Sequence, residues 1–69
     1  MKISARNQLK GKVVEIAKRA TTAHARIEMT GGQIVTAPIT NAAADDLGLA
    51  PGRAATAVIK ASDVMVAVD

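Results

Sequence analysis

The sequence predicts a small all-β domain with one short helix, and three observations carry this prediction. Apolar residues alternate with polar ones in several short segments, as they do in strands that are buried on one face. Turn signals rich in glycine and proline separate these segments at short intervals. One alanine-rich segment has the signals of a helix start and a helix end. At 69 residues the chain is expected to form one domain, residues 1–69.

Two strands are expected in the first thirty residues. In residues 12–19, Val14 and Ile16 alternate with Glu15, which predicts a strand with the two apolar side chains on one face. Residues 23–29 alternate more regularly, with apolar side chains at every second position. This pattern predicts a second strand that is buried on one face and exposed to solvent on the other.

A hairpin should connect the second strand to a third. Residues 30–33 are Thr-Gly-Gly-Gln, which is a turn signal between two β-type segments. The third strand is expected over residues 33–39. It contains Pro38, which lacks an N–H group and therefore belongs on an edge strand or at a strand end.

The second half should contain a short helix followed by two strands. Thr40 or Asn41 can cap a helix over residues 41–47, and Gly48 can adopt the left-handed conformation that ends it. The order β-β-β-α-β-β with short connections suits a Greek-key barrel of the OB type, so we expect an OB-like barrel of five strands. The last two strands are expected at residues 53–61 and 64–68.

The composition indicates that one copy of the chain has little material for a core. Alanine occurs 15 times, and there is no phenylalanine, tyrosine, tryptophan or cysteine. Alanine buries little apolar area, and aromatic residues usually dominate core energetics. Without cysteine, disulfides and thiolate metal sites are excluded. A small domain without such supports commonly gains stability by self-association, so we expect a homo-oligomer.

Location and charge add two expectations. No apolar signal-peptide segment follows Lys2, and no stretch approaches the ~20 apolar residues that a membrane helix needs. We therefore expect a cytoplasmic protein without a membrane partner. The formal net charge of +3 permits anionic ligands without identifying one.

A polar cluster at residues 4–7 could surround an anion. Ser4 offers a hydroxyl, Arg6 offers a planar guanidinium with several donors, and Asn7 offers an amide. In an extended chain Ser4 and Arg6 would face the same side. Exposed polar residues are common, so a solvated N-terminal segment is the alternative interpretation.

A second cluster near the other end of the chain repeats this chemistry. In a strand, Val58, Lys60 and Ser62 would share one face, with Lys60 set in an apolar run. Lys60 and Ser62 combine a cation with a hydroxyl, and backbone N–H groups around Ala61 could add donors. If the two clusters meet, they would suit a doubly charged oxyanion. The alternative is an edge lysine that protects against aggregation.

The remaining polar residues indicate no catalytic site. Thr40 and the helix start after it could attract an anion, although plain capping also explains Thr40. His24 is the single histidine, whereas a metal site needs several ligands. Asp45 and Asp46 are adjacent and would not face each other on a helix. We expect neither an enzyme nor a site for a bare metal cation.

Three segments of this chain resemble the molbindins of the Mop family, which are TOBE-like molybdate-binding domains. They are KISARNQLKGKV at residues 2–13, APIT at residues 37–40 and VIKASDVM at residues 58–65. The first and third segments together are fairly specific, whereas either alone would be weak. The resemblance extends over essentially the whole chain.

The resemblance implies a fold and a function. Family members fold as small OB-like barrels and assemble as hexamers that are trimers of dimers. They hold molybdate or tungstate non-covalently at subunit interfaces, do no chemistry on it and need no organic cofactor. This chain lacks a DNA-binding segment and a nucleotide-binding loop, so it resembles the free-standing form that stores the oxyanion in the cytoplasm.

The resemblance also implies which residues bind the oxyanion. Ala61 would act through its backbone, and Thr40 through its hydroxyl or backbone. Ala43 is a departure, because related domains can carry a serine three positions past the threonine; one hydroxyl contact would then be missing or replaced. The implied oxyanion-binding residues are Ser4, Arg6, Asn7, Thr40, Lys60, Ala61 and Ser62.

Two alternatives from other functional classes stay open. A nucleic-acid-binding OB-like module would fit the positive net charge, but modules that bind single strands stack bases on aromatic side chains, and this chain has none. A regulatory domain that binds a larger partner chain is the second alternative. The expected partners are therefore further copies of this chain and a small oxyanion, without nucleic acid.

Overall fold

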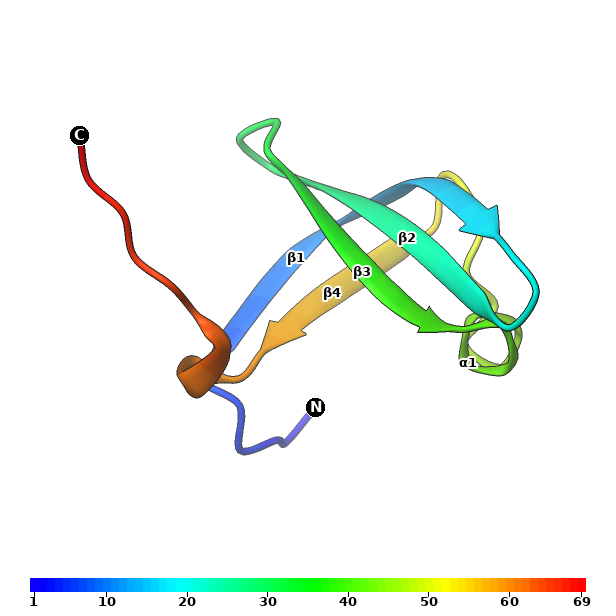
Figure 1. Cartoon of the computed structure of the whole chain (residues 1–69), viewed down its shortest axis with the longest axis horizontal. Coiled ribbons are helices and arrows are strands. Elements are labelled where there is room, and N and C mark those ends of the chain that lie inside the picture. The colour runs from blue at the N-terminus through cyan, green and yellow to red at the C-terminus, as the bar shows by residue number, and fades with distance from the viewer.

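The computed structural model describes all 69 residues as a strongly curled antiparallel sheet with one helix at its end (Figure 1). The strand order is β3-β2-β1-β4, so β3 and β4 are the edge strands of a half-barrel. The predicted OB-like, all-β fold with one short helix is confirmed, but with four strands instead of five. In chain order the elements are β1 (Asn7–Lys18), β2 (Thr22–Met29), β3 (Ile34–Thr40), α1 (Asn41–Asp46), β4 (Ala54–Ile59) and the 3-10 turn η1 (Ala61–Asp63).

β1 is longer and less regular than the sequence pattern predicts. It begins at Asn7 because its first half pairs with β4. The pairing with β2 shifts between Val13 and Glu15, which inserts one extra residue into β1. This irregularity reverses the alternation: Val13 is fully buried, whereas Val14 is 39% exposed. The prediction that Val14 faces the core with Ile16 is therefore wrong, and Val13 takes that place.

Gly11 is required where β1 passes closely over β2. A Cβ atom at this position would contact the carbonyl oxygen of Glu28 and would lie 2.7 Å from Cε of Met29 and 3.0 Å from Cγ2 of Ile27. Because the carbonyl belongs to the sheet backbone, it cannot move aside. We expect Gly11→Ala to lower the free energy of unfolding by about 2 kcal/mol, in the range of overpacked cores. Urea unfolding at a fixed protein concentration measures the change.

Gly31 provides the control for this substitution. A Cβ atom there would meet only the side chain of Gln33, whose flexible end can move away. We expect Gly31→Ala to stay within about 0.5 kcal/mol of the parent protein, as surface substitutions commonly do. Equal stability of the two alanine variants would contradict the role given to Gly11.

The turns and caps that join the elements follow their sequence signals. The hairpin after β2 closes with a hydrogen bond from the Met29 N–H to the Gln33 carbonyl, at 2.7 Å. At the start of α1, Oγ1 of Thr40 accepts a hydrogen bond from the Ala43 N–H at 3.0 Å, so Thr40 is the N-cap. Gly48 has a φ of 64°, which ends the helix in the left-handed conformation. These three predictions are confirmed.

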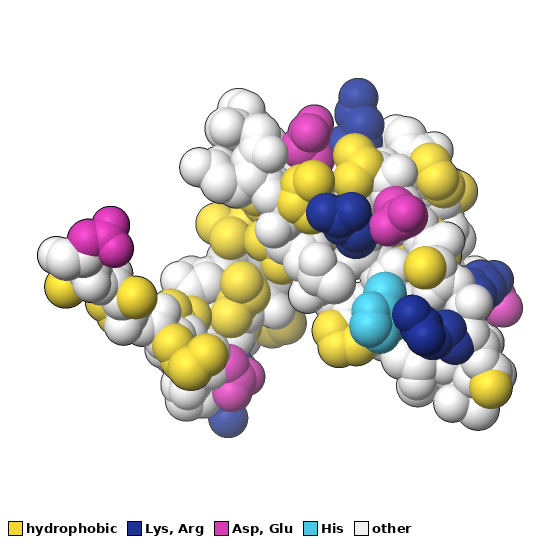
Figure 2. Space-filling view, turned by 45° about the horizontal axis from the view of Figure 1, so that its top comes forward, with side chains coloured by type: hydrophobic (Ala, Val, Ile, Leu, Met, Phe, Trp, Pro, Cys, Tyr) yellow, Lys and Arg dark blue, Asp and Glu magenta, His cyan; other side chains and the backbone are white.

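The predicted fifth strand is absent. Residues 64–69 form no strand, and Met65, Val66 and Val68 are 94%, 88% and 91% exposed. Figure 2 shows this C-terminal segment as an arm with hydrophobic side chains that projects from the body of the molecule. The cause is η1, since it turns the chain away from the sheet before the apolar segment begins (Figure 1). A strand needs a neighbour to satisfy its backbone, and this segment has none within the chain.

The core of one chain is small. Val13, Ile27 and Ala57 form its central cluster, with Ile16 and Leu49 among the half-buried side chains packed against it. The buried residues are Val13, Ala23, Ala25, Ile27, Ala44 and Ala57.

No helix has both the length and the apolar character needed to cross a lipid bilayer.

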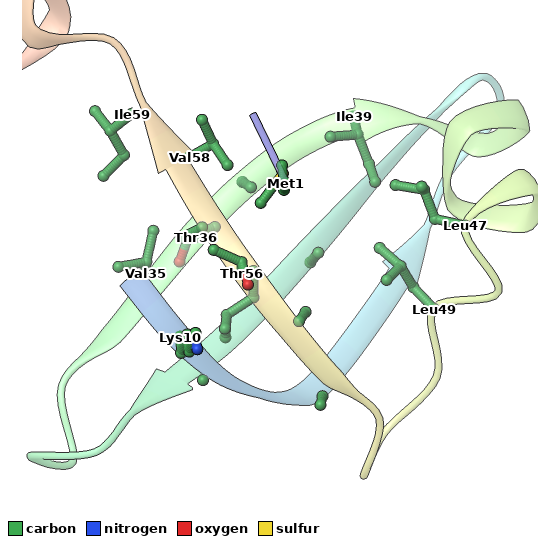
Figure 3. Close-up of a pocket in the computed structure, with 17 residues that line it drawn as sticks. Met1, Lys10, Val35, Thr36, Ile39, Leu47, Leu49, Thr56, Val58 and Ile59 are labelled. Carbon is green, nitrogen blue, oxygen red and sulfur yellow. The ribbon is translucent and has the colours of Figure 1, made fainter. Parts of the chain in front are cut away.

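An apolar groove runs along the open side of the half-barrel, between the two edge strands. Its volume is about 840 Å³, and 13 of its 17 lining residues are hydrophobic. In Figure 3, Val35 and Ile39 from β3 and Val58 and Ile59 from β4 surround this space. In a closed five-stranded barrel a further strand would lie here, between β3 and β4.

Candidate anion-binding site

The pairing of β1 with β4 brings the two polar clusters to the same end of the sheet. The two strands are antiparallel, and their last paired residues are Asn7 and Ile59. Arg6 and Lys60 are the next residues outward on the two chains. Figure 1 accordingly shows η1 beside the start of β1. Segments that are more than fifty residues apart in the sequence thus lie side by side.

A side-chain hydrogen bond reinforces this junction. The Nδ2 atom of Asn7 donates to the carbonyl oxygen of Ile59 over 3.2 Å. Asn7 is half-buried, whereas Arg6 and Lys60 are both exposed. The junction therefore ends the sheet, with two exposed cationic residues just beyond it.

The local conformation of both clusters differs from the expected strands. The chain bends at Ser4 and Arg6, so strand alternation does not place their side chains on one face. β4 ends at Ile59, and Ser62 belongs to η1. The prediction that Val58, Lys60 and Ser62 share one face of a strand is therefore wrong. In a 3-10 turn, successive side chains rotate around the axis with three residues per turn.

The two cations at this end lack carboxylate partners. Ion pairs form elsewhere on the sheet, between Lys18 and Asp45 and between Arg26 and Glu15. Neither Arg6 nor Lys60 takes part in an ion pair. Both side chains are exposed, so neither charge is neutralised within this chain.

The backbone of η1 adds potential donors beside Lys60. Within the turn, the N–H groups of Asp63 and Val64 donate to the carbonyls of Lys60 and Ala61. The N–H groups at the start of such a turn have no partner inside it. Ala61 and Ser62 occupy these first positions and directly follow Lys60 in the chain.

Thr40 lies at the opposite end of the sheet. It is the last residue of β3, pairs with Thr22 and caps α1, which packs against β2 and β3. In Figure 1, α1 and η1 are at opposite ends of the molecule. One chain therefore does not bring Thr40 together with Arg6 and Lys60. The position of Ala43 is next to Thr40, to whose hydroxyl it donates its N–H.

The other polar residues form no cluster of metal ligands. His24 is exposed on the outer face of β2, opposite Ala17 and Pro38 on the neighbouring strands. Nowhere in the chain do three or more histidine, aspartate or glutamate side chains come together. The carboxylate of Asp45 pairs with Lys18, which ties α1 to the end of β1.

The sequence interpretation missed the apolar groove and the bond from Asn7. The sequence pattern does not reveal the groove because it predicts that residues 64–68 complete the barrel of their own chain. Asn7 was grouped with exposed polar residues, although its side chain turns toward β4. Asn7 is both the last residue of the polar cluster and the first residue of β1. Its hydrogen bond to Ile59 could have been predicted only from the pairing of the two ends of the chain.

Comparison with known proteins identifies the family to which this curled sheet belongs. Residues 3–66 match the TOBE domain family. Molybdenum-pterin-binding protein 3 of Clostridium pasteurianum is 52% identical over 66 residues, which cover 96% of this chain and 97% of that protein. The chain therefore belongs to the TOBE domain family, among the molybdenum-pterin-binding (Mop) proteins.

Solved structures agree with this assignment. A molybdate-binding protein from Sporomusa ovata has a TM-score of 0.92 and 38% identity, over 99% of this chain and 100% of that one. The cytoplasmic molybdate-binding protein ModG, in a form with molybdate bound, has a TM-score of 0.91 and 43% identity. That alignment covers 94% of this chain but 46% of ModG, so this chain corresponds to about half of ModG. The resemblance to the Mop family is confirmed.

Proposed function

We propose that this protein binds molybdate or tungstate reversibly and stores it in the cytoplasm, without chemical turnover. The observation that carries the proposal is the placement of Arg6 and Lys60, two cations without carboxylate partners, just beyond the end of the β1–β4 pairing. The names of the Mop relatives support a ligand that contains molybdenum, and the molybdate-binding protein of Sporomusa ovata and ModG support molybdate itself.

The residues at this end suit a tetrahedral dianion. Arg6 and Lys60 would neutralise its two charges, and charged donors make the stronger hydrogen bonds to oxyanions. Hydroxyls of Ser4 and Ser62 and the N–H group of Ala61 would supply neutral donors. Binding therefore needs only hydrogen bonds and charge, with no organic cofactor and no covalent step.

Thr40 would join this site only from a second copy. It lies at the far end of the sheet in its own chain, whereas a small oxyanion contacts groups only a few ångströms apart. A site shared between copies would combine Arg6 and Lys60 of one chain with Thr40 of another. The proposed oxyanion site is thus an interface site, and its ligand stabilises the assembly by mass action.

Self-association has a second support in the C-terminal segment. Residues 64–68 are apolar and exposed, and the groove between β3 and β4 is apolar and open. If two copies exchange this segment, each groove receives the strand that closes its barrel and the exposed valines become buried. We propose such dimers as the units of a homohexamer, a trimer of dimers, in which each chain forms a single domain over residues 1–69.

Native mass spectrometry with and without molybdate tests the function. We expect a hexamer that takes up molybdate in discrete steps and does not take up sulfate at the same concentration. Isothermal titration with molybdate, tungstate and sulfate then gives the affinities. A monomer or dimer that ignores molybdate would overturn the proposal. Salt-dependent binding of an oligonucleotide by that species would instead favour the nucleic-acid module.

A further inference from the structure

We infer that Asn7 is a positioning residue, which orients Lys60 for the oxyanion through the carbonyl of Ile59 and is not itself a ligand. This inference rests on the proposed function, because it assigns a role within the same site. It replaces the role that family resemblance implies for Asn7, in which this side chain contacts the oxyanion.

The hydrogen bond from Asn7 to Ile59 joins the two halves of the site. Its donor is Nδ2 of Asn7 and its acceptor is the Ile59 carbonyl oxygen, 3.2 Å away and 52 positions along the chain. No other side-chain hydrogen bond connects residues 1–7 with residues 59–63. The β1–β4 pairing ends at these same two residues, and no hydrogen bond joins the two segments beyond them.

Holding the Ile59 carbonyl also orients the next residue. A peptide unit is planar and trans, so the carbonyl of Ile59 and the N–H of Lys60 point in opposite directions. A carbonyl directed at Asn7 therefore directs the Lys60 N–H away from β1. Lys60 then has φ −63° and ψ 136° and leads directly into η1. Asn7 thus fixes the orientation of the peptide plane between Ile59 and Lys60, which in turn sets the directions of the Lys60 side chain and of η1.

The exposure of the site residues separates Asn7 from the candidate ligands. Ser4, Arg6, Lys60 and Ser62 are all exposed, whereas Asn7 is half-buried and its amide is directed at a backbone carbonyl of its own chain. A ligand residue would direct its donor outward. An amide that satisfies a main-chain acceptor is instead part of the framework.

Gln8 provides a matched comparison on the same strand. Its Nε2 atom also donates to a backbone carbonyl, that of Ala5, at 3.3 Å. This bond is local and exposed, and it links residues of the same chain segment. Gln8 therefore has the same chemistry as Asn7 without any connection to β4 through its side chain.

A double-mutant cycle tests the inference in the full-length protein. Asn7→Leu keeps the side-chain size and removes the donor, and Lys60→Ala removes the group that Asn7 is inferred to orient. We expect Asn7→Leu to weaken molybdate binding by about fivefold, the effect of one neutral hydrogen bond. In the Lys60→Ala background the same change should have a clearly smaller effect, because coupled residues are not additive. An equal loss in both backgrounds would show direct contact and overturn the inference.

Two further readouts keep the test decisive. Gln8→Leu should leave the affinity for molybdate unchanged. In ligand-free protein, Asn7→Leu should shift the backbone amide signals of residues 60–62 in NMR spectra, and Gln8→Leu should not. If the parent protein binds no molybdate, the proposed function fails, while the spectra still show whether Asn7 orders Lys60. Unshifted amides would overturn the inference by themselves. If Asn7→Leu does not fold, Asn7→Ala serves in its place, because it also removes the donor.

Discussion

Lys60→Ala and Arg6→Ala should each weaken molybdate binding by about 10- to 100-fold, the equivalent of one charge-assisted hydrogen bond of roughly 1.5–3 kcal/mol. Both side chains lie just beyond the end of the β1–β4 pairing, and neither has a carboxylate partner. A dianion placed there would lose half of its neutralising charge in either variant. Isothermal titration of each variant against the parent protein measures the loss.

The control for these variants is Lys12→Ala. Lys12 is also exposed and lies on β1, but it faces Glu28 and Ala54 on the neighbouring strands, away from the end of the sheet. Lys12→Ala removes one positive charge, as Arg6→Ala and Lys60→Ala do, so an effect of net charge alone would appear in all three variants. We expect its affinity for molybdate to stay within about twofold. Unchanged affinity in both Arg6→Ala and Lys60→Ala would refute the site.

Val66→Asp should dissociate the oligomer and abolish oxyanion binding with it. Val66 is 88% exposed in one chain and lies in the middle of the apolar C-terminal segment. In an exchanged strand, Val64, Val66 and Val68 would share one face, and we assign that face to the groove. An unpaired carboxylate buried there costs about 3–5 kcal/mol per chain, more than a hundredfold in the association constant. Native mass spectrometry at several protein concentrations measures the shift.

Val14→Asp is the matched control for the C-terminal variant. Val14 is a half-exposed valine on β1 that does not line the groove. We expect it to leave the mass of the assembly unchanged. If Val66→Asp remains fully assembled, the C-terminal segment does not close a neighbouring barrel, and another surface must hold the copies together. If the two aspartate variants dissociate alike, the effect is not specific to the groove.

Local signals predicted most of the fold because local contacts determine those elements. The hairpin after β2 and the helix between Thr40 and Gly48 depend on residues within a few positions of each other. The early start of β1 could not be predicted in this way, since residues 7–12 form a strand by pairing with β4. The irregularity at Val13 likewise depends on the partner strand. An apolar pattern alone does not show which of two adjacent valines faces the core.

The fifth strand shows a different limit of sequence interpretation. The composition of residues 64–68 is right for a strand, and the segment is indeed extended beyond η1. What the pattern does not contain is the identity of the neighbouring strand. Periodicity describes which face of a strand is apolar, but pairing is a property of the chains that meet.

For the candidate site, the sequence predicts which residue types take part better than it predicts where their side chains lie. Both polar clusters were found by residue type, and the structure brings Arg6 and Lys60 to one end of the sheet. Their side-chain directions were wrong, because bends and η1 replace the strands on which alternation depends. Thr40 was grouped with them although it lies at the far end. Contact of the oxyanion with six of the seven residues remains a prediction, and for Asn7 the hydrogen bond to Ile59 favours a positioning role instead.

The small buried core changes which substitutions this protein can tolerate. Four of its six buried residues are alanine. In an ordinary core the damaging changes are truncations, which leave cavities, and enlargements are the rarer problem. Here an alanine has a single methyl group to lose, whereas a larger side chain at Ala23 or Ala44, which do not line the groove, must displace its neighbours. The interior of this fold therefore restricts sequence drift mainly by an upper limit on side-chain size, and small residues can replace one another where bulky ones cannot enter.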